Sequence, residues 1–209
     1  MIRRIGLWGG PSTSKSTLAA WLFSELKTKQ IAAEHVQEGV KDWTWINRKP
    51  EGLDQVLLMA MQLHKEDTIL RKSRAVVVSE SPLRLGLCYA RQMKMPGLEH
   101  LERLADMFEG MYPSINFFIE REGSYDPTGR FENPDEAVAM DRLMLETGGV
   151  PLIRIRRNDR EKLIDLVLKA IKPPDPSPGY VHQQCDRCQQ FKEVKNYSTF
   201  LFCDECKEK

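Results

Sequence analysis

Hydrophobic and polar positions alternate along the chain between two kinds of segment. Five short apolar runs are of the kind that parallel sheets bury, at 2–8, 31–38, 75–79, 115–119 and 151–155. Other segments carry apolar residues at helical spacing, at 15–29, 54–71, 97–111 and 159–171, and one more begins at Asn133-Pro134. The alternation predicts an α/β fold of three layers, in which helices cover both faces of a parallel sheet of about five strands.

The helical segment 54–71 carries one apolar face and one candidate for chemistry. Val56, Leu57, Ala60 and Met61 fall on the same side of the predicted helix. His64 lies in this helix too, and it could face a ligand or be an ordinary surface or packing residue. The pattern alone does not choose between these roles for His64.

The alternation stops at 172–180, where the sequence KPPDPSPGY has four prolines in nine residues. Such a stretch is typical of a stiff, extended linker. We therefore predict a main domain at 1–172, a proline-rich linker at 173–180 and a small second domain at 181–209.

Composition narrows the functional classes. Of the 209 residues, 41% are hydrophobic and 29% charged, which is ordinary for a soluble globular protein. No run approaches the roughly 18–20 apolar residues that a membrane span needs, and the N-terminus has no long apolar signal segment. We expect a cytoplasmic protein without a membrane partner. With 31 basic and 30 acidic residues, the net charge of +1 argues against binding nucleic acid through overall charge, and a local basic groove stays open.

The segment after the first apolar run resembles a phosphate-binding loop, with the sequence Gly9-Gly10-Pro11-Ser12-Thr13-Ser14-Lys15-Ser16-Thr17. The general pattern is G-x-x-x-x-G-K-S/T, and Ser14 stands where the second glycine usually is. The amides of such a loop point inward, and the following helix adds positive potential. We expect the loop to bind ATP, with Lys15 on the β- and γ-phosphates and the Ser16 hydroxyl on Mg²⁺. The alternative is a serine-rich turn with a chance lysine.

Two carboxylates end apolar runs of the predicted P-loop sheet. Glu80 follows the run at 75–79, where an acid that holds the metal would lie. The alternative is that Glu80 is only an acidic residue near the start of a helix. Glu38 ends the run at 31–38. Because parallel strands deliver their C-terminal ends to one crevice, Glu38 could take the proton of an acceptor hydroxyl. A solvated turn glutamate competes with this interpretation of Glu38, and Asp42 is the nearest substitute as a base.

The polar segment 121–130 follows the fourth apolar run and is typical of a lid. Arg121 and Arg130 could close on the phosphates and neutralise charge in the transition state. A solvated basic loop is the alternative. Trp43 and Trp45 follow Glu38 closely and could stack on a ring or belong to the core.

Residues 1–172 resemble the small P-loop kinase-like proteins common in bacteriophage genomes, which are often classed with AAA-family ATPases. Their layout is similar to that of nicotinamide riboside kinases and deoxynucleoside kinases. The resemblance implies a kinase that passes the γ-phosphoryl group of ATP to a nucleoside-type hydroxyl, and some relatives are implicated in phosphorylating 5-hydroxymethyluracil in phage DNA. This sequence departs from the family at Ser14, where many relatives have Gly, and at Glu80, where many have Asp. The stretches that carry the resemblance are Gly9–Thr17, Glu38–Asp42, Gln62–His64, Ser79–Pro82 and Tyr125–Arg130.

The last 25 residues contain two C-x-x-C pairs separated by fourteen residues, formed by Cys185, Cys188, Cys203 and Cys206. This is typical of a zinc ribbon, in which four thiolates close a tetrahedral Zn²⁺ site. Iron in a rubredoxin-like site is the alternative, and His182 could replace one ligand. A unit of 29 residues is below the roughly 40 at which a domain usually needs help to fold, and the metal would supply that help. The ribbon could contact specific bases or another protein.

Taken together, the residues predict an ATP- and Mg²⁺-dependent kinase, and the resemblance implies that its acceptor is a nucleoside, a nucleotide or a hydroxymethylpyrimidine in DNA. Two alternatives stay open. One is a P-loop ATPase that acts on a nucleic-acid or protein complex without a phosphate acceptor, and the other is a binding module with a degenerate P-loop. A homo-oligomer is compatible with the sequence.

Overall fold

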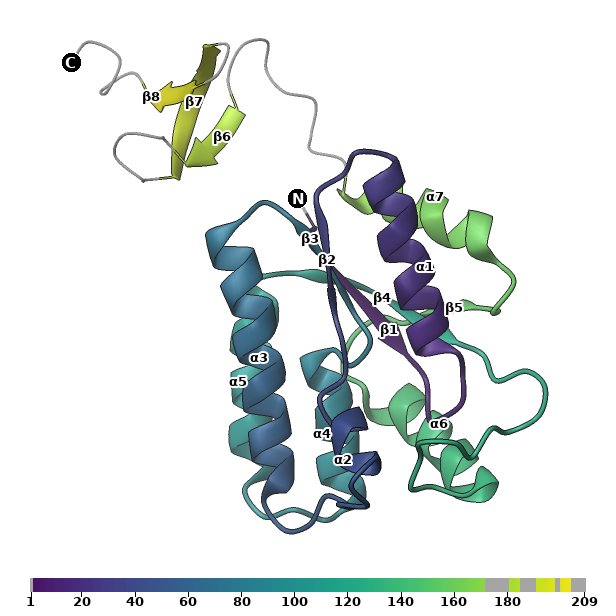
Figure 1. Ribbon diagram of the computed structural model, residues 1–209. Helices are drawn as coiled ribbons and strands as arrows, with labels where there is room; N and C mark the ends of the chain where they lie inside the picture. The colour runs from purple at the N-terminus through teal and green to yellow at the C-terminus, as the bar shows by residue number, and fades with distance from the viewer. Residues whose placement is uncertain (1, 172–180, 185–190, 198–199, 204–209) are drawn as a thin grey trace. The chain divides into compact units, whose positions relative to one another are not determined.

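The structure is a computed structural model that describes residues 2–171, 181–184, 191–197 and 200–203 (Figure 1). The chain divides into two units, Ile2–Ile171 and a smaller unit that begins at Lys172. The larger unit contains the whole phosphate-loop segment and the carboxylates and arginines that the sequence singles out.

The larger unit is built on a sheet of five parallel strands in the order β2-β3-β1-β4-β5. Both neighbours of the central strand β1 pair with it in parallel. All five residues of β1 are buried, as expected for a strand covered on both faces. The predicted parallel sheet is confirmed. Its strands are β1 (Arg4–Trp8), β2 (Ala33–Val36), β3 (Val76–Ser79), β4 (Ser114–Ile119) and β5 (Ile153–Ile155).

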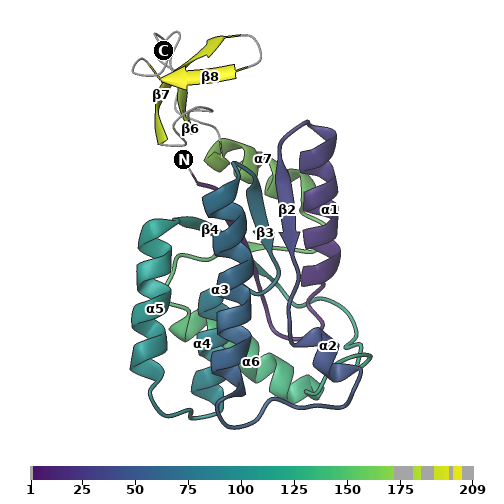
Figure 2. The ribbon, with the colours of Figure 1, turned by 60° about the vertical axis from the view of Figure 1, so that its left-hand side comes forward.

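Helices cover both faces of this sheet (Figure 2). On one face, α1 (Lys15–Thr28) and α7 (Arg160–Ile171) contribute Leu22 and Val167 to a core with Ile5 of β1. On the other face lie α3 (Asp54–Lys72), α4 (Leu83–Gln92) and α5 (Leu98–Met111), which share a second core, and α6 (Pro134–Thr147), which packs on Trp8. The predicted α/β/α arrangement is therefore confirmed.

Helix α6 begins as its sequence predicts. The Asn133 side chain accepts a hydrogen bond from the Glu136 amide, and Glu136 accepts one from the Asn133 amide, which is a capping box. Two helices lie where the pattern predicted none: the one-turn α2 (Lys41–Thr44) and α4, which starts after Pro82.

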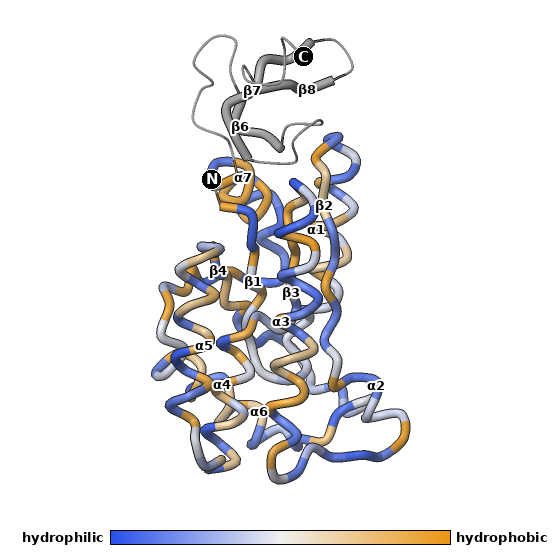
Figure 3. Tube along the Cα trace, turned by 90° about the vertical axis from the view of Figure 1, so that its left-hand side faces the viewer, coloured by the Kyte–Doolittle hydropathy of each residue, from blue (hydrophilic) through white to orange (hydrophobic). Residues whose placement is uncertain are grey.

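Helix α3 forms over nearly the predicted range, but its orientation differs from what its apolar face indicates. Hydrophilic and hydrophobic positions alternate along the tube of α3 (Figure 3). Val56, Leu57 and Met61 are 40%, 48% and 37% exposed, whereas Gln62 and Glu66 are buried. The reason is a polar network on the sheet. Gln62 donates to Glu66 and to Ser79, and Glu66 accepts from Arg4 of β1, so burial of this network outweighs burial of the aliphatic face.

The smaller unit contains a three-stranded antiparallel sheet of β6 (Val181–Gln184), β7 (Phe191–Tyr197) and β8 (Phe200–Cys203), in that order. Residues 185–190 and 204–209, and with them Cys185, Cys188 and Cys206, lie outside the described residues, as does the linker 173–180. The Cys203 side chain is not described either, so the zinc site and the domain boundaries stay predictions.

Within the described part of the chain, no helix has the length and apolar character of a membrane span.

Candidate active site

The phosphate loop connects β1 to α1 and is shaped by its glycines. Gly9 has φ 142°, and a Cβ there would lie 2.5 Å from Thr13 Oγ1. A Cβ on Gly10 would lie 2.7 Å from the Ala137 carbonyl oxygen, so α6 approaches the loop closely. Ser14 has φ 68°, the left-handed conformation that favours glycine. The loop therefore has the backbone that the consensus glycine would adopt, although serine occupies the position.

Lys15 lies inside this loop. Its Nζ donates hydrogen bonds to the carbonyl oxygens of Gly9 and Gly10, at 2.7 and 3.0 Å. Burial lowers the pKa of Lys15, and the Glu38 carboxylate acts in the opposite direction. The ammonium group is therefore buried against the backbone of the loop.

Ser16 and Glu80 form the candidate metal site. Ser16 Oγ donates a hydrogen bond of 2.5 Å to Glu80 Oε2, and the Glu80 residue is 3% exposed. Burial acts to raise the pKa of Glu80, but hydrogen bonds from His35 and Ser16 outweigh it and lower that pKa. Glu80 is thus held as an anion. A hydroxyl and a carboxylate at the end of the phosphate loop are the oxygen ligands that Mg²⁺ prefers, so these residues fit a magnesium ion. In the described residues, no three His, Cys, Asp or Glu side chains come together as a metal site.

Arg121 lies on the outer side of the phosphate loop. It donates from Nε to Asp141 Oδ2 at 2.7 Å and from a terminal nitrogen to the Pro11 carbonyl oxygen at 2.8 Å. Asp141 Oδ1 accepts from the Gly10 amide at 2.5 Å. In this structure, Arg121 therefore braces the loop backbone, and its assignment as a phosphate clamp stays a prediction. Sequence reasoning missed Asp141, although a carboxylate on the stripe of Ala137, Met140 and Met144 was a usable signal.

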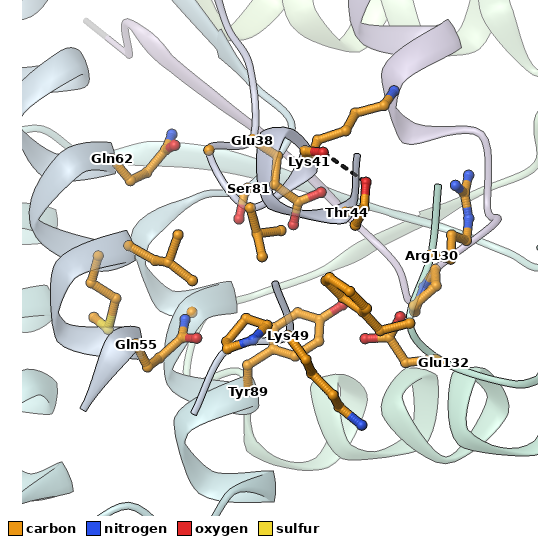
Figure 4. A pocket seen from close by; sticks show the side chains of 18 of the residues that line it. Glu38, Lys41, Thr44, Lys49, Gln55, Gln62, Ser81, Tyr89, Arg130 and Glu132 are labelled. Atoms are coloured by element: carbon orange, nitrogen blue, oxygen red, sulfur yellow. Dashed lines mark hydrogen bonds between the residues drawn. The ribbon is translucent and has the colours of Figure 1, made fainter. Parts of the chain in front are cut away.

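A pocket of about 180 Å³ opens beside the loop. Ser16 of the phosphate loop lines it together with Glu38 and Arg130, the last two labelled in Figure 4. Residues of α2, α3 and α4 and residues 129–132 form the rest of its walls. Burial raises the pKa of Glu38, while Lys15 acts against that shift. Arg130 donates to the Thr128 carbonyl oxygen, and its Nε is buried without a hydrogen-bond partner among the described residues. The structure thus brings Lys15, Ser16, Glu38, Glu80 and Arg130 together.

The part of the pocket between α3 and α4 has a different character. Gln55 and Tyr89 reach it together with Leu58, Met59 and Met93, as Figure 4 shows for the two labelled polar residues. Gln55 is 6% exposed and its side-chain amide has no hydrogen-bond partner among the described residues. Burial raises the pKa of Tyr89 well above its usual value, so its hydroxyl stays protonated. This region offers an apolar slot with two neutral polar groups.

Gly86 of α4 makes room for this arrangement. A Cβ at Gly86 would lie 2.8 Å from Met59 Cγ and 3.1 Å from Gln55 Nε2. The close approach of α3 and α4 therefore depends on the glycine. Sequence reasoning did not single out Gln55, Gly86 or Tyr89, because nothing in the local pattern distinguishes a pocket glutamine from a surface one.

The structure also places the four residues whose roles the sequence left open: His64, Asp42, Trp43 and Trp45. His64 and Asp42 are exposed, whereas two carboxylates, Glu38 and Glu132, line the pocket. Trp43 is half-buried under the Arg48 guanidinium, whose central carbon lies 3.8 Å from the ring centroid. Trp45 is 65% exposed and belongs to no core.

The sequence around this site matches a known protein family. The AAA domain family matches residues 4–162, which is more than half of the chain. The chain belongs to the AAA domain family. As an AAA domain protein it has an α/β fold of the P-loop NTPase type, with the sheet order described above.

A comparison with curated proteins gave no match. Among solved structures, the crystal structure of NadR protein in complex with NR is similar, with a TM-score of 0.59 and 16% sequence identity. The similarity covers 84% of this AAA domain chain and 54% of the NadR chain, so the chain corresponds to about half of that protein's length. At this identity the likeness is one of fold.

Proposed function

We propose that this protein is an ATP- and Mg²⁺-dependent kinase that transfers the γ-phosphoryl group to a hydroxyl of a nucleoside-type acceptor. The observation that carries the proposal is the pocket that starts at Ser16 and Glu38 and continues between α3 and α4. A P-loop ATPase without an acceptor has no need for such a space beside its phosphate site.

Each residue of the site has a role in this reaction. The loop amides of residues 9–17 and Lys15 bind the triphosphate. Ser16 and Glu80 hold Mg²⁺, which when bound neutralises charge on the β- and γ-phosphates. Arg130 lies at the same end of the pocket, where its guanidinium can contact the transferring group.

Glu38 serves as the base. Its carboxylate accepts the proton of the acceptor hydroxyl as the oxygen attacks the γ-phosphorus and the bond to the leaving ADP oxygen breaks. Burial favours this transfer because it raises the pKa of Glu38 and so makes the ionised carboxylate a better proton acceptor. The nearby Lys15 and Arg130 keep the ionised form accessible.

The slot between α3 and α4 suits the ring of the acceptor. The apolar side chains of Leu58, Met59 and Met93 can cover the faces of a planar heterocycle, and the Gln55 amide can both donate to and accept from its edge. Of the residues that line the pocket, the cationic ones are Lys41, Lys49 and Arg130, and none of them belongs to α3 or α4. A neutral ring therefore fits this slot better than a phosphate. NadR, whose fold is similar, was crystallised in complex with NR, which is compatible with an acceptor of this class.

A finer proposal is that the acceptor is a hydroxymethylpyrimidine, 5-hydroxymethyluracil, within phage DNA. The ammonium groups of Lys41 and Lys49 extend away from the pocket that they line (Figure 4). The exposed Trp45 ring lies against Gly129, where a Cβ would be 3.3 Å from the ring. Cations and an indole around a pocket are what a strand carrying an extruded base would contact. The predicted ribbon would be a second point of contact.

Label transfer from γ-labelled ATP tests both levels of the proposal. The acceptors are a panel of free nucleosides, DNA containing 5-hydroxymethyluracil and the same DNA containing thymine. Label in the modified DNA alone supports the finer proposal, and label in free nucleosides alone supports a small-molecule kinase. Acceptor-independent phosphate release with no labelled acceptor contradicts both and favours the ATPase. Lys15→Ala should abolish transfer, whereas Lys27→Ala, on the same helix and half-exposed, should not.

A further inference from the structure

His35 contacts the candidate metal-holding carboxylate from the neighbouring strand. Its Nε2 lies 2.6 Å from Glu80 Oε1, while Ser16 Oγ binds the other oxygen, Oε2. The contact is within ion-pair distance, and Nε2 makes no hydrogen bond of regular geometry in the described part of the chain. The two oxygens of Glu80 thus have different partners, one on β2 and one at the start of α1.

The imidazole is fixed in place by its surroundings. The His35 side chain is 13% exposed, and the Phe23 ring of α1 lies beside it with the centroids 6.1 Å apart. His35 belongs to β2, which pairs with β3, and the Glu80 amide donates to the Val36 carbonyl oxygen at 3.2 Å. Backbone and imidazole therefore hold Glu80 from the same strand, and its carboxylate has little freedom to turn.

We propose that His35 is a positioning residue that orients the Glu80 carboxylate for the metal of the nucleotide complex. With a proton on Nε2, the imidazole attracts Oε1 across the 2.6 Å contact and leaves Oε2 directed at Ser16, where the ion would be held. Loss of this donor frees the carboxylate to rotate and leaves Oε1 without a partner in a buried place. Outer partners that orient a metal ligand commonly change metal affinity by about 10- to 100-fold. This inference rests on the metal role given to Ser16 and Glu80 in the proposed function.

The test measures nucleotide binding, so it does not depend on finding the acceptor. Binding of a non-hydrolysable ATP analogue to the full chain is followed by calorimetry at rising Mg²⁺ and, separately, in EDTA. His35→Leu removes the donor at similar bulk, and His35→Gln keeps an N–H near the Nε2 position. His64→Leu, at an exposed histidine of α3, is the matched control.

We expect His35→Leu to raise the Mg²⁺ concentration for half-maximal binding by about tenfold or more, with binding in EDTA unchanged within about twofold. His35→Gln should recover most of the Mg²⁺ dependence, and His64→Leu should match the unsubstituted protein. The proposal is overturned if His35→Leu leaves the Mg²⁺ requirement unchanged or weakens binding equally with and without the metal.

Two outcomes separate this inference from the function on which it rests. If the unsubstituted protein binds the analogue with no dependence on Mg²⁺, the metal role of Ser16 and Glu80 fails as well. If that dependence is present and survives in His35→Leu, only the role of His35 fails. Should His35→Leu not fold, comparing His35→Gln with His35→Asn, whose amide is too short to reach Oε1, makes the same distinction.

Discussion

Arg121 and Asp141, twenty residues apart, form a 2.7 Å ion pair that contacts the backbone of the phosphate loop. Asp141 binds the Gly10 amide and Arg121 binds the Pro11 carbonyl oxygen, so the pair fixes two consecutive residues of the loop. The loop conformation that offers amides to a phosphate is thus supported from α6 as well as from α1.

Replacing this carboxylate should weaken nucleotide binding. In Asp141→Ala, Arg121 loses its counter-ion and the Gly10 amide loses its acceptor, which together cost about 1–3 kcal/mol. We expect affinity for a non-hydrolysable ATP analogue to fall about tenfold in calorimetry. Glu146→Ala, at an exposed site on the same helix, should change it little. Unchanged affinity in Asp141→Ala would show that the pair does not support the nucleotide-binding conformation.

The pH dependence of phosphoryl transfer should report Glu38. A base must be ionised, and burial raises the pKa of Glu38 above its ordinary value of 4.5. The acidic limb of the kcat/KM profile for the acceptor should therefore lie at higher pH than an ordinary glutamate would give. Glu38→Gln should remove most of the activity at all pH values. An acidic limb at or below pH 4.5 would assign the base to another group.

The same shift predicts that Glu38 lowers stability at neutral pH. Because its folded-state pKa is raised, its favourable contribution is present below pH 4.5 and is lost as the pH rises through the folded-state value. At pH 7 Glu38→Gln should raise the free energy of unfolding in urea titrations, and below pH 4.5 the gain should vanish. A loss of stability at pH 7 would mean that the charges of Lys15 and Arg130 outweigh burial.

Serine at position 14 should cost stability. A side chain at φ 68° costs about 1–2 kcal/mol, and the greater freedom of unfolded glycine offsets part of this. We expect Ser14→Gly to raise the free energy of unfolding by about 0.5–1 kcal/mol. Ser12 has nearly the same φ, but its Oγ accepts from the Asp126 amide, so Ser12→Gly should gain less. If Ser14→Gly destabilises the protein, the serine side chain has a role that its contacts do not reveal.

The buried ion pair of Arg4 and Glu66 should be sensitive to loss of one partner. Arg4 also binds Glu109 and lies over the Phe108 ring. Arg4→Met leaves Glu66, which is 1% exposed, without its cation, and breaking such a pair costs about 3–5 kcal/mol. Arg71→Met, at a largely exposed arginine on α3, should cost less than about 1 kcal/mol. Urea denaturation measures both, and similar losses would contradict the network.

Several features of the site could be predicted from local sequence because they depend on short segments. The phosphate loop needs only neighbouring residues and the helix that follows, so Lys15 and Ser16 lie where the motif predicts. Glu38 and Glu80 follow adjacent parallel strands, whose C-terminal ends meet at one edge of a sheet, and their proximity follows from that rule. The capping box at Asn133 is equally local.

Other features depend on contacts between distant segments. Helix α3 turns Gln62 and Glu66 inward because Arg4 and Ser79 provide partners on strands far from it in the sequence. Arg121 binds the loop because α6 brings Asp141 beside Gly10.

The amino-acid sequence by itself therefore determined the strands, most of the helices, the phosphate loop and the carboxylates at the strand ends, since each follows from periodicity or from spacing within a few residues. The tertiary structure alone decided which face of α3 is buried, where Arg121 points and which side chains form the pocket. These depend on the balance between burying apolar area and satisfying buried polar groups. That balance is set only when segments distant in sequence come into contact.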